Sequence, residues 1–129
     1  MTQQSHEQAM ITLMEEILRI LGQHEANEMI HFYVNGRHFS TDDQPTFIEH
    51  QISTAKKTFS YYEDPVPCNV TKQVEFNNPQ TITMTFEGPM YHDINYGSGK
   101  ILDKINKRAT KYGLYAELGY AWSLALYEI

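Results

Sequence analysis

The start of the chain carries the pattern of an amphipathic helix. Six apolar side chains recur there at the three- and four-residue spacing of one helical face. Ser5 and Gln8 form a capping box ahead of them, and Gly22 is a typical stop signal. We therefore predict a helix over residues 5–21.

Three later segments also carry helical signals. Residues 42–62 place apolar side chains at helical spacing, although the composition of 58–62 favours a strand in the last turn. Residues 88–96 begin with Gly-Pro and predict a short helical turn. Residues 98–112 predict an amphipathic helix with Ser98 as its N-cap.

A hairpin is predicted around Asn35–Gly36. This dipeptide separates two β-prone runs, and both of its residues readily adopt the positive φ that a two-residue turn needs. The turn would pair Phe32 with Phe39 on the face that meets the core. His31 and His38 would then share the opposite face.

The remaining segments predict three more strands. Residues 70–76 and 81–87 resemble a second antiparallel pair around a polar turn. Residues 114–126 alternate large and small side chains, which predicts one long central strand. Trp122 would then belong to the core, and Gly119 would mark a bulge or a close approach.

Together these elements predict a single α+β domain over residues 1–129. We expect the order α-ββ-α-ββ-α-β, with a mostly antiparallel sheet of about five strands and two to three helices packed on one face. A chain of 129 residues can bury a core without covalent staples. Cys68 is the single cysteine, so no intramolecular disulfide is expected. The sequence has neither a signal-peptide pattern nor a membrane span, so we expect a cytoplasmic protein.

Charge is unevenly distributed along the chain. The formal net charge is -6, while residues 98–112 carry five basic side chains and one acid, or +4, which leaves -10 elsewhere. An acidic balance disfavours nucleic-acid backbones as partners. The basic stripe is a candidate binding site for an acidic partner, and the alternative is a solvated helix face. Its members are Lys100, Lys104, Lys107, Arg108 and Lys111.

Candidate acid–base chemistry gathers in one short segment. Tyr91, His92, Asp93 and Asn95 follow directly on a predicted strand, where connecting segments often carry binding sites. These four are the candidate catalytic residues. The alternative is a turn with polar groups that face solvent.

Metal binding has weaker support. His31 and His38 are candidate ligands because they share one face of the predicted hairpin. A third ligand would have to come from a residue such as His50, His92 or Asp93. Since the chain lacks the ligand spacing of known zinc motifs, we expect neither a metal nor another cofactor.

Two functions are compatible with these patterns. We favour a small acidic interaction or accessory protein of the adaptor or toxin-neutralising type, which binds a protein partner or a second copy of itself and no membrane. Aromatic residues make up 12% of the chain, and Tyr and Trp on a partly exposed sheet face often mark interfaces. The alternative is a small-molecule-binding or acid–base enzyme domain with a pocket around residues 91–95.

Overall fold

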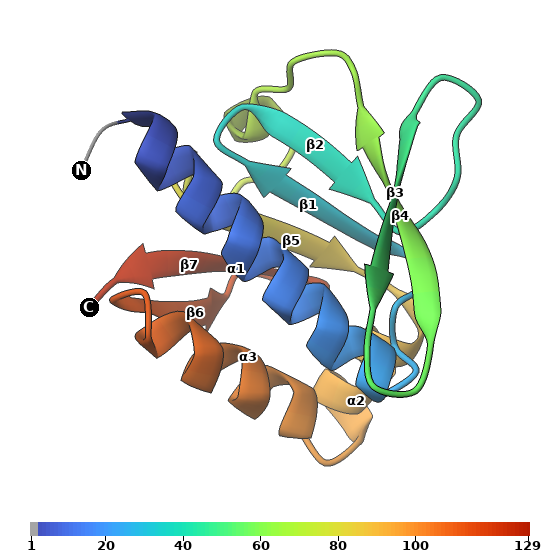
Figure 1. The fold of residues 1–129 in the computed structure, drawn as a ribbon. Coiled ribbons are helices and arrows are strands. Elements are labelled where there is room, and N and C mark those ends of the chain that lie inside the picture. The colour runs from blue at the N-terminus through green and yellow to red at the C-terminus, as the bar shows by residue number, and fades with distance from the viewer. Residues whose placement is uncertain (1–2) are drawn as a thin grey trace.

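Seven antiparallel strands form one sheet, and helices pack on one of its faces (Figure 1). The computed structural model describes residues 3–129 of the chain, and side chains from Ser5 onward. The helices are α1 (Gln3–Gln23), α2 (Gly88–Tyr96) and α3 (Lys100–Thr110), and η1 (Val70–Lys72) is a 3-10 turn. The strands are β1 (Ile30–Val34), β2 (Arg37–Ser40), β3 (Ile48–Ser53), β4 (Thr58–Asp64), β5 (Ile82–Phe86), β6 (Leu114–Leu118) and β7 (Ser123–Glu128).

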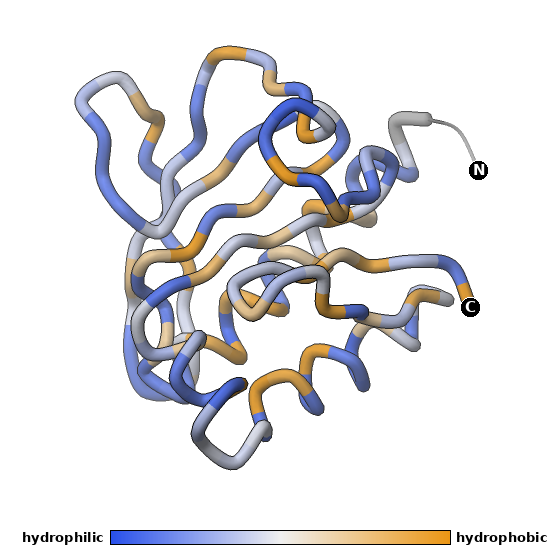
Figure 2. The backbone as a smooth tube through the Cα atoms, turned by 180° about the vertical axis from the view of Figure 1, so that it is seen from behind, coloured by the Kyte–Doolittle hydropathy of each residue, from blue (hydrophilic) through white to orange (hydrophobic). Residues whose placement is uncertain are grey.

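The strand order in the sheet is β3-β4-β2-β1-β5-β7-β6. The α+β class and the antiparallel sheet with helices on it are confirmed, with seven strands where about five were predicted. The order along the chain is α-ββ-ββ-β-αα-ββ. Orange and blue alternate along the strands in Figure 2, as expected for a sheet with one apolar and one more polar face.

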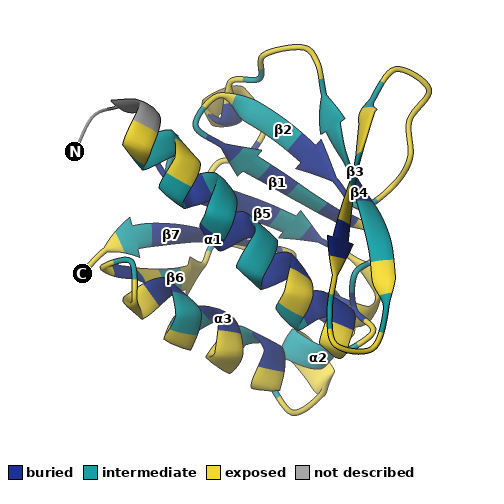
Figure 3. Cartoon of the chain, viewed as in Figure 1, coloured by how far each residue is buried: buried dark blue, intermediate teal, exposed yellow. Residues whose placement is uncertain are grey.

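Helix α1 lies across the sheet and turns its apolar stripe towards it (Figure 3). The six apolar side chains of the predicted stripe, from Met10 to Leu21, are all at most 3% exposed. The helix begins before Ser5, so this residue lies inside it and is not the predicted cap. Gly22 is not the stop either, because α1 continues to Gln23. A Cβ at Gly22 would lie 2.5 Å from the ring of Phe59. The glycine allows α1 to approach β4 closely.

The hairpin around Asn35–Gly36 is confirmed. Both residues have positive φ, 49° and 84°, as the turn requires. Phe32 pairs with Phe39, and both are 1% exposed in the core. The opposite face of the hairpin carries the two histidines.

The helix predicted over residues 42–62 is wrong, because this segment forms the β3–β4 hairpin. Ile48 and Ile52 are four residues apart, a spacing that puts two side chains on one face of either a helix or a strand. Pairing across the hairpin resolves the ambiguity, since Ile52 lies opposite Phe59. The turn is held by Thr54, whose hydroxyl accepts a hydrogen bond from the Lys57 backbone at 3.2 Å.

The strand predicted over residues 70–76 is also wrong. Here the chain forms η1, in which Val70 is 5% exposed, and Val74, two residues beyond η1, is 3% exposed. Val70 and Val74 are four residues apart, a spacing that again fits a strand as well as a helical turn. The partner strand over 81–87 is confirmed as β5, but it pairs with β1 and β7.

The long strand predicted over residues 114–126 is instead the β6–β7 hairpin. Its turn is closed by a hydrogen bond from Gly119 N to Ser123 O at 3.0 Å and one from Ser123 N to Tyr120 O at 3.2 Å. The turn lifts Trp122 out of the core, and its side chain is 41% exposed. The predicted core position of Trp122 is therefore wrong.

The helix predicted over 98–112 is confirmed as α3, although its N-cap is Gly99, with φ of 74°. Ser98 Oγ still accepts a hydrogen bond from Lys100 N at 3.3 Å. Over residues 3–129, no helix combines the length and the apolar character that a membrane crossing requires.

Candidate functional site

Two of the candidate catalytic residues on α2 hold neighbouring elements in place. Asp93 accepts a hydrogen bond from Ile101 N at 3.3 Å, at the start of α3, where a carboxylate is electrostatically favourable. Asn95 donates to the backbone carbonyl of Ala121 at 2.9 Å and so ties α2 to the β6–β7 turn.

The other two pack against a third ring. Tyr91 and His92 both contact Tyr96, with ring centroids 6.2 Å and 5.5 Å apart. The hydrogen bond between the two tyrosines raises the pKa of Tyr91. The four side chains thus contact three different parts of the chain, at Tyr96, Ile101 and Ala121.

The predicted basic residues lie along α3 beside a shallow depression at its seam with α1. Lys107 lies 3.4 Å from Asp103 and Arg108 lies 3.8 Å from Glu16, whereas Lys100 stands at the start of the helix. Such exposed pairs contribute at most about 1 kcal/mol each. The depression has a volume of about 280 Å³, and its basic lining residues are Lys104, Lys107, Arg108 and Lys111.

The two candidate metal ligands form part of a hydrogen-bonded chain with Asp64. Nδ1 of His31 lies 2.9 Å from Nε2 of His38, whose Nδ1 lies 3.3 Å from the Asp64 carboxylate. A carboxylate can only accept, so Nδ1 of His38 donates to Asp64. When both rings are neutral, Nε2 of His38 accepts from Nδ1 of His31, and Nε2 of His31 is then an acceptor. Among residues 3–129, no group of three or more His, Cys, Asp or Glu side chains is arranged to hold a metal ion.

His31 should make the protein less stable in mild acid. Burial and the neighbouring His38 lower its pKa, while the carboxylates of Asp42 and Glu87 act weakly against this shift. The unfolded chain keeps the ordinary value of about 6.5 and so binds the proton first. The stability that the neutral His31 ring contributes is complete above about pH 6.5, and it is lost as the pH falls towards the lowered pKa.

Urea denaturation of the parent and of a His31→Gln variant tests this dependence. Between about pH 7.5 and pH 5, the free energy of unfolding should fall more steeply in the parent. Because the two carboxylates and His38 are present in both proteins, parallel curves would show that His31 titrates normally.

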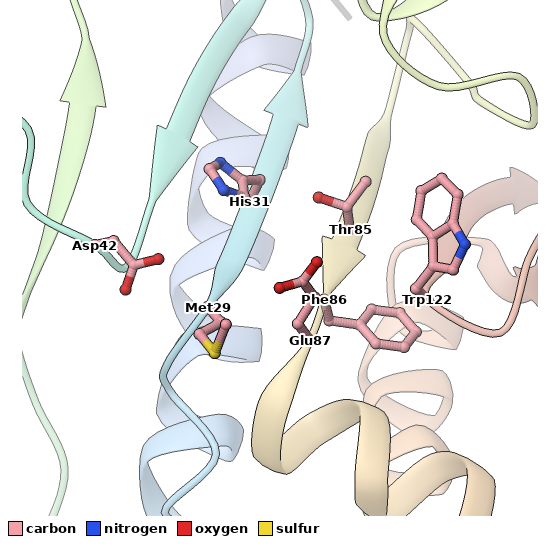
Figure 4. A pocket seen from close by; sticks show the side chains of 7 residues that line it. All are labelled: Met29, His31, Asp42, Thr85, Phe86, Glu87 and Trp122. Atoms are coloured by element: carbon pink, nitrogen blue, oxygen red, sulfur yellow. The ribbon is translucent and has the colours of Figure 1, made fainter.

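His31 lies on the wall of a cavity of about 230 Å³ on the sheet face opposite α1. Figure 4 shows Asp42 and Trp122 at opposite ends of this cavity, with His31, Thr85 and Glu87 between them. Glu87 precedes α2 but its side chain makes no capping hydrogen bond. Among the residues that the structure describes, no cation pairs with either carboxylate. The cavity is thus rich in unused acceptors.

Met29 completes the rim of this cavity in a strained conformation. Its φ is 61°, in the left-handed region that residues other than glycine seldom occupy, and its side chain is 44% exposed. Strain of this kind persists where the surrounding structure enforces it, and it often occurs at binding sites.

A row of exposed aromatic rings begins at the same cavity. Trp122 stacks on Tyr120 with centroids 5.0 Å apart, and Tyr120 contacts Phe76 edge-on at 5.1 Å. Their exposed fractions are 41%, 37% and 45%. We call Phe76, Tyr120 and Trp122 the aromatic row. Contiguous exposed apolar patches often mark interaction sites.

At its other end, away from the first cavity, the aromatic row reaches a separate depression, and acidic side chains border the row. This depression, of about 380 Å³, is lined by Phe76, Leu118 and Glu117, among others. The carboxylate of Glu75 accepts a hydrogen bond from the Tyr120 hydroxyl, which raises the pKa of that hydroxyl. With the two acids of the first cavity, four carboxylates accompany the aromatic row.

The turn that carries the aromatic row is held firmly. Tyr120 N donates to the buried Ser123 hydroxyl at 2.9 Å, and the carbonyl of Trp122 accepts from Phe86 N on β5 at 2.8 Å. Gly119 marks a close approach, as predicted, because a Cβ there would lie 2.7 Å from Cβ of Phe76. The backbone that carries Tyr120 and Trp122 is therefore held in place by hydrogen bonds.

Comparison with known proteins adds no relative. No family model, no curated protein and no solved structure matches this chain.

Proposed function

We propose that this chain is a non-enzymatic interaction domain that binds a basic protein segment through the aromatic row and the carboxylates beside it. Such a role suits an adaptor or a toxin-neutralising protein. The observation that carries the proposal is the exposed, stacked pair Tyr120 and Trp122 on a turn fixed by hydrogen bonds.

Several properties of the surface support this proposal. Tyr and Trp dominate the energetics of protein interfaces, particularly where they lie near depressions that a partner can fill. A surface fixed in advance loses little conformational entropy on binding. Since Glu75, Glu117, Asp42 and Glu87 accompany the rings, a basic segment is the complementary partner.

The basic depression at the α1–α3 seam is the rival surface, and it would select acidic partners. One experiment separates the two. Random 12-residue peptides displayed on phage are selected against the immobilised protein, and the winners are then tested on two variants. The first is Trp122→Ala, and the second is the triple charge reversal Lys104→Glu, Lys107→Glu and Lys111→Glu.

The proposal expects enriched peptides rich in Arg or Lys. Their binding should depend on Trp122 and should not be weakened by the triple variant. Each exposed reversal should change stability by less than about 0.5 kcal/mol, so the triple variant stays folded. Enrichment of acidic peptides that fail on the triple variant would place the function on α3. Peptides indifferent to Trp122→Ala would equally overturn the proposal.

A further inference from the structure

We propose that the cavity between Asp42 and Trp122 binds the guanidinium group of a single arginine side chain of the partner. This inference rests on the proposed function and names the chemical group of the partner that the cavity beside Trp122 accepts. Four observations carry it: the size of the cavity, its acceptor chemistry, its unpaired charge and its aromatic wall.

The size of the cavity favours one side chain. Its volume of about 230 Å³ lies below the range of about 300–1,000 Å³ that is typical of pockets for whole small molecules. It is also continuous with the aromatic row, because Trp122 belongs to both. A segment lying along the row can therefore place a side chain in the cavity.

The chemistry of the lining favours a donor. The carboxylates of Asp42 and Glu87 only accept hydrogen bonds, and Nε2 of His31 is a further acceptor when both rings of the His31–His38–Asp64 chain are neutral. An anionic guest would meet two like charges here, and a neutral guest would leave them uncompensated. A positively charged donor is complementary to both carboxylates.

The shape of the donor set favours arginine over lysine. A guanidinium presents five N–H donors in one plane, which suits several acceptors spread over a wall. Its flat face also packs on an indole, which Trp122 offers at one end of the cavity (Figure 4). The ammonium of lysine carries three donors on one atom and cannot bridge as many groups.

The single tryptophan of the chain reports on this cavity directly. The parent is titrated with N-acetyl-arginine methylamide, and Trp122 fluorescence is followed. A saturable change is expected. The same titration with the citrulline analogue, which has nearly the same shape and no charge, should give none. The lysine analogue should bind more weakly than arginine.

Two variants with equal loss of charge locate the binding. Asp42→Asn with Glu87→Gln should weaken arginine binding at least tenfold, and both sites are exposed, so the fold is retained. The matched control is Glu49→Gln with Glu128→Gln, two exposed acids outside the cavity, which should leave binding unchanged. Equal weakening in both variants would mean a general charge effect and would overturn the proposal, as would equal binding of the citrulline or lysine analogue.

Failure here is distinguishable from failure of the proposed function. If selected peptides bind through Trp122 but tolerate the replacement of every arginine by citrulline, the arginine pocket is wrong and the interaction surface stands. If no selected peptide depends on Trp122 while the arginine analogue still binds in the cavity, the pocket stands and the proposed function falls.

Discussion

Replacing Trp122 by alanine should weaken binding of the selected basic peptides at least about 30-fold, which corresponds to about 2 kcal/mol and is the threshold of an interface hot spot. The reason is that Trp122 contributes to both parts of the surface. It forms a wall of the first cavity and stacks on Tyr120 in the aromatic row. Isothermal titration calorimetry on parent and variant measures the ratio of affinities.

Tyr96→Ala is the matched control for this variant. Tyr96 is also an exposed aromatic residue, at 72%, but it lies at the end of α2 beside Tyr91 and His92. Its loss should leave peptide affinity unchanged. The opposite pattern, with binding sensitive to Tyr96 and indifferent to Trp122, would move the function to residues 91–96.

Replacing Phe32 by alanine should lower the free energy of unfolding by about 3–5 kcal/mol, as is usual for a large buried aromatic. Phe32 is 1% exposed at the centre of β1, which lies in the middle of the sheet. Removing its ring leaves a cavity that packed strands and α1 cannot easily close. Equilibrium denaturation in urea measures the loss.

Phe76→Ala is the corresponding control, because this phenylalanine is 45% exposed in the aromatic row. Its truncation should cost no more than about 1 kcal/mol, as for other surface changes. If the two variants lost equal stability, the assignment of Phe32 to the core and of Phe76 to a binding surface would be wrong.

The parts of the fold that the sequence predicted well are those with a specific local signal. Asn35–Gly36 sets both the turn and the register of its hairpin, and with them the position of His31 beside His38. Gly88–Pro89 similarly marked the start of α2. In each case the residues themselves restrict the backbone.

The predictions that were wrong needed a choice between helical and strand periodicity, or knowledge of which distant segments pair in the sheet. Ile48 and Ile52 fit a helix as well as a strand, and only the partner Phe59 decides between them. The turn before Ser123 lacks an Asn-Gly or Pro signal, so the two strands on either side of it were predicted as one. Trp122 was consequently placed in the core.

The candidate site was missed for a related reason. Its residues come from the ends of several strands, and the sheet brings them together through pairings between segments far apart in the chain. Asp64 reaches His38 because β4 pairs with β2, and Glu87 reaches His31 because β5 pairs with β1. Alternation along β1 indicated only that His31 would lie opposite the core.

The most direct test of the central claim is to map where a selected basic peptide binds on the ¹⁵N-labelled protein by NMR. We predict that the largest amide shifts fall on residues 74–77, 85–87 and 118–123, which together form the aromatic row and the wall of the first cavity. Shifts concentrated instead along α3, at residues 100–111, would contradict the account.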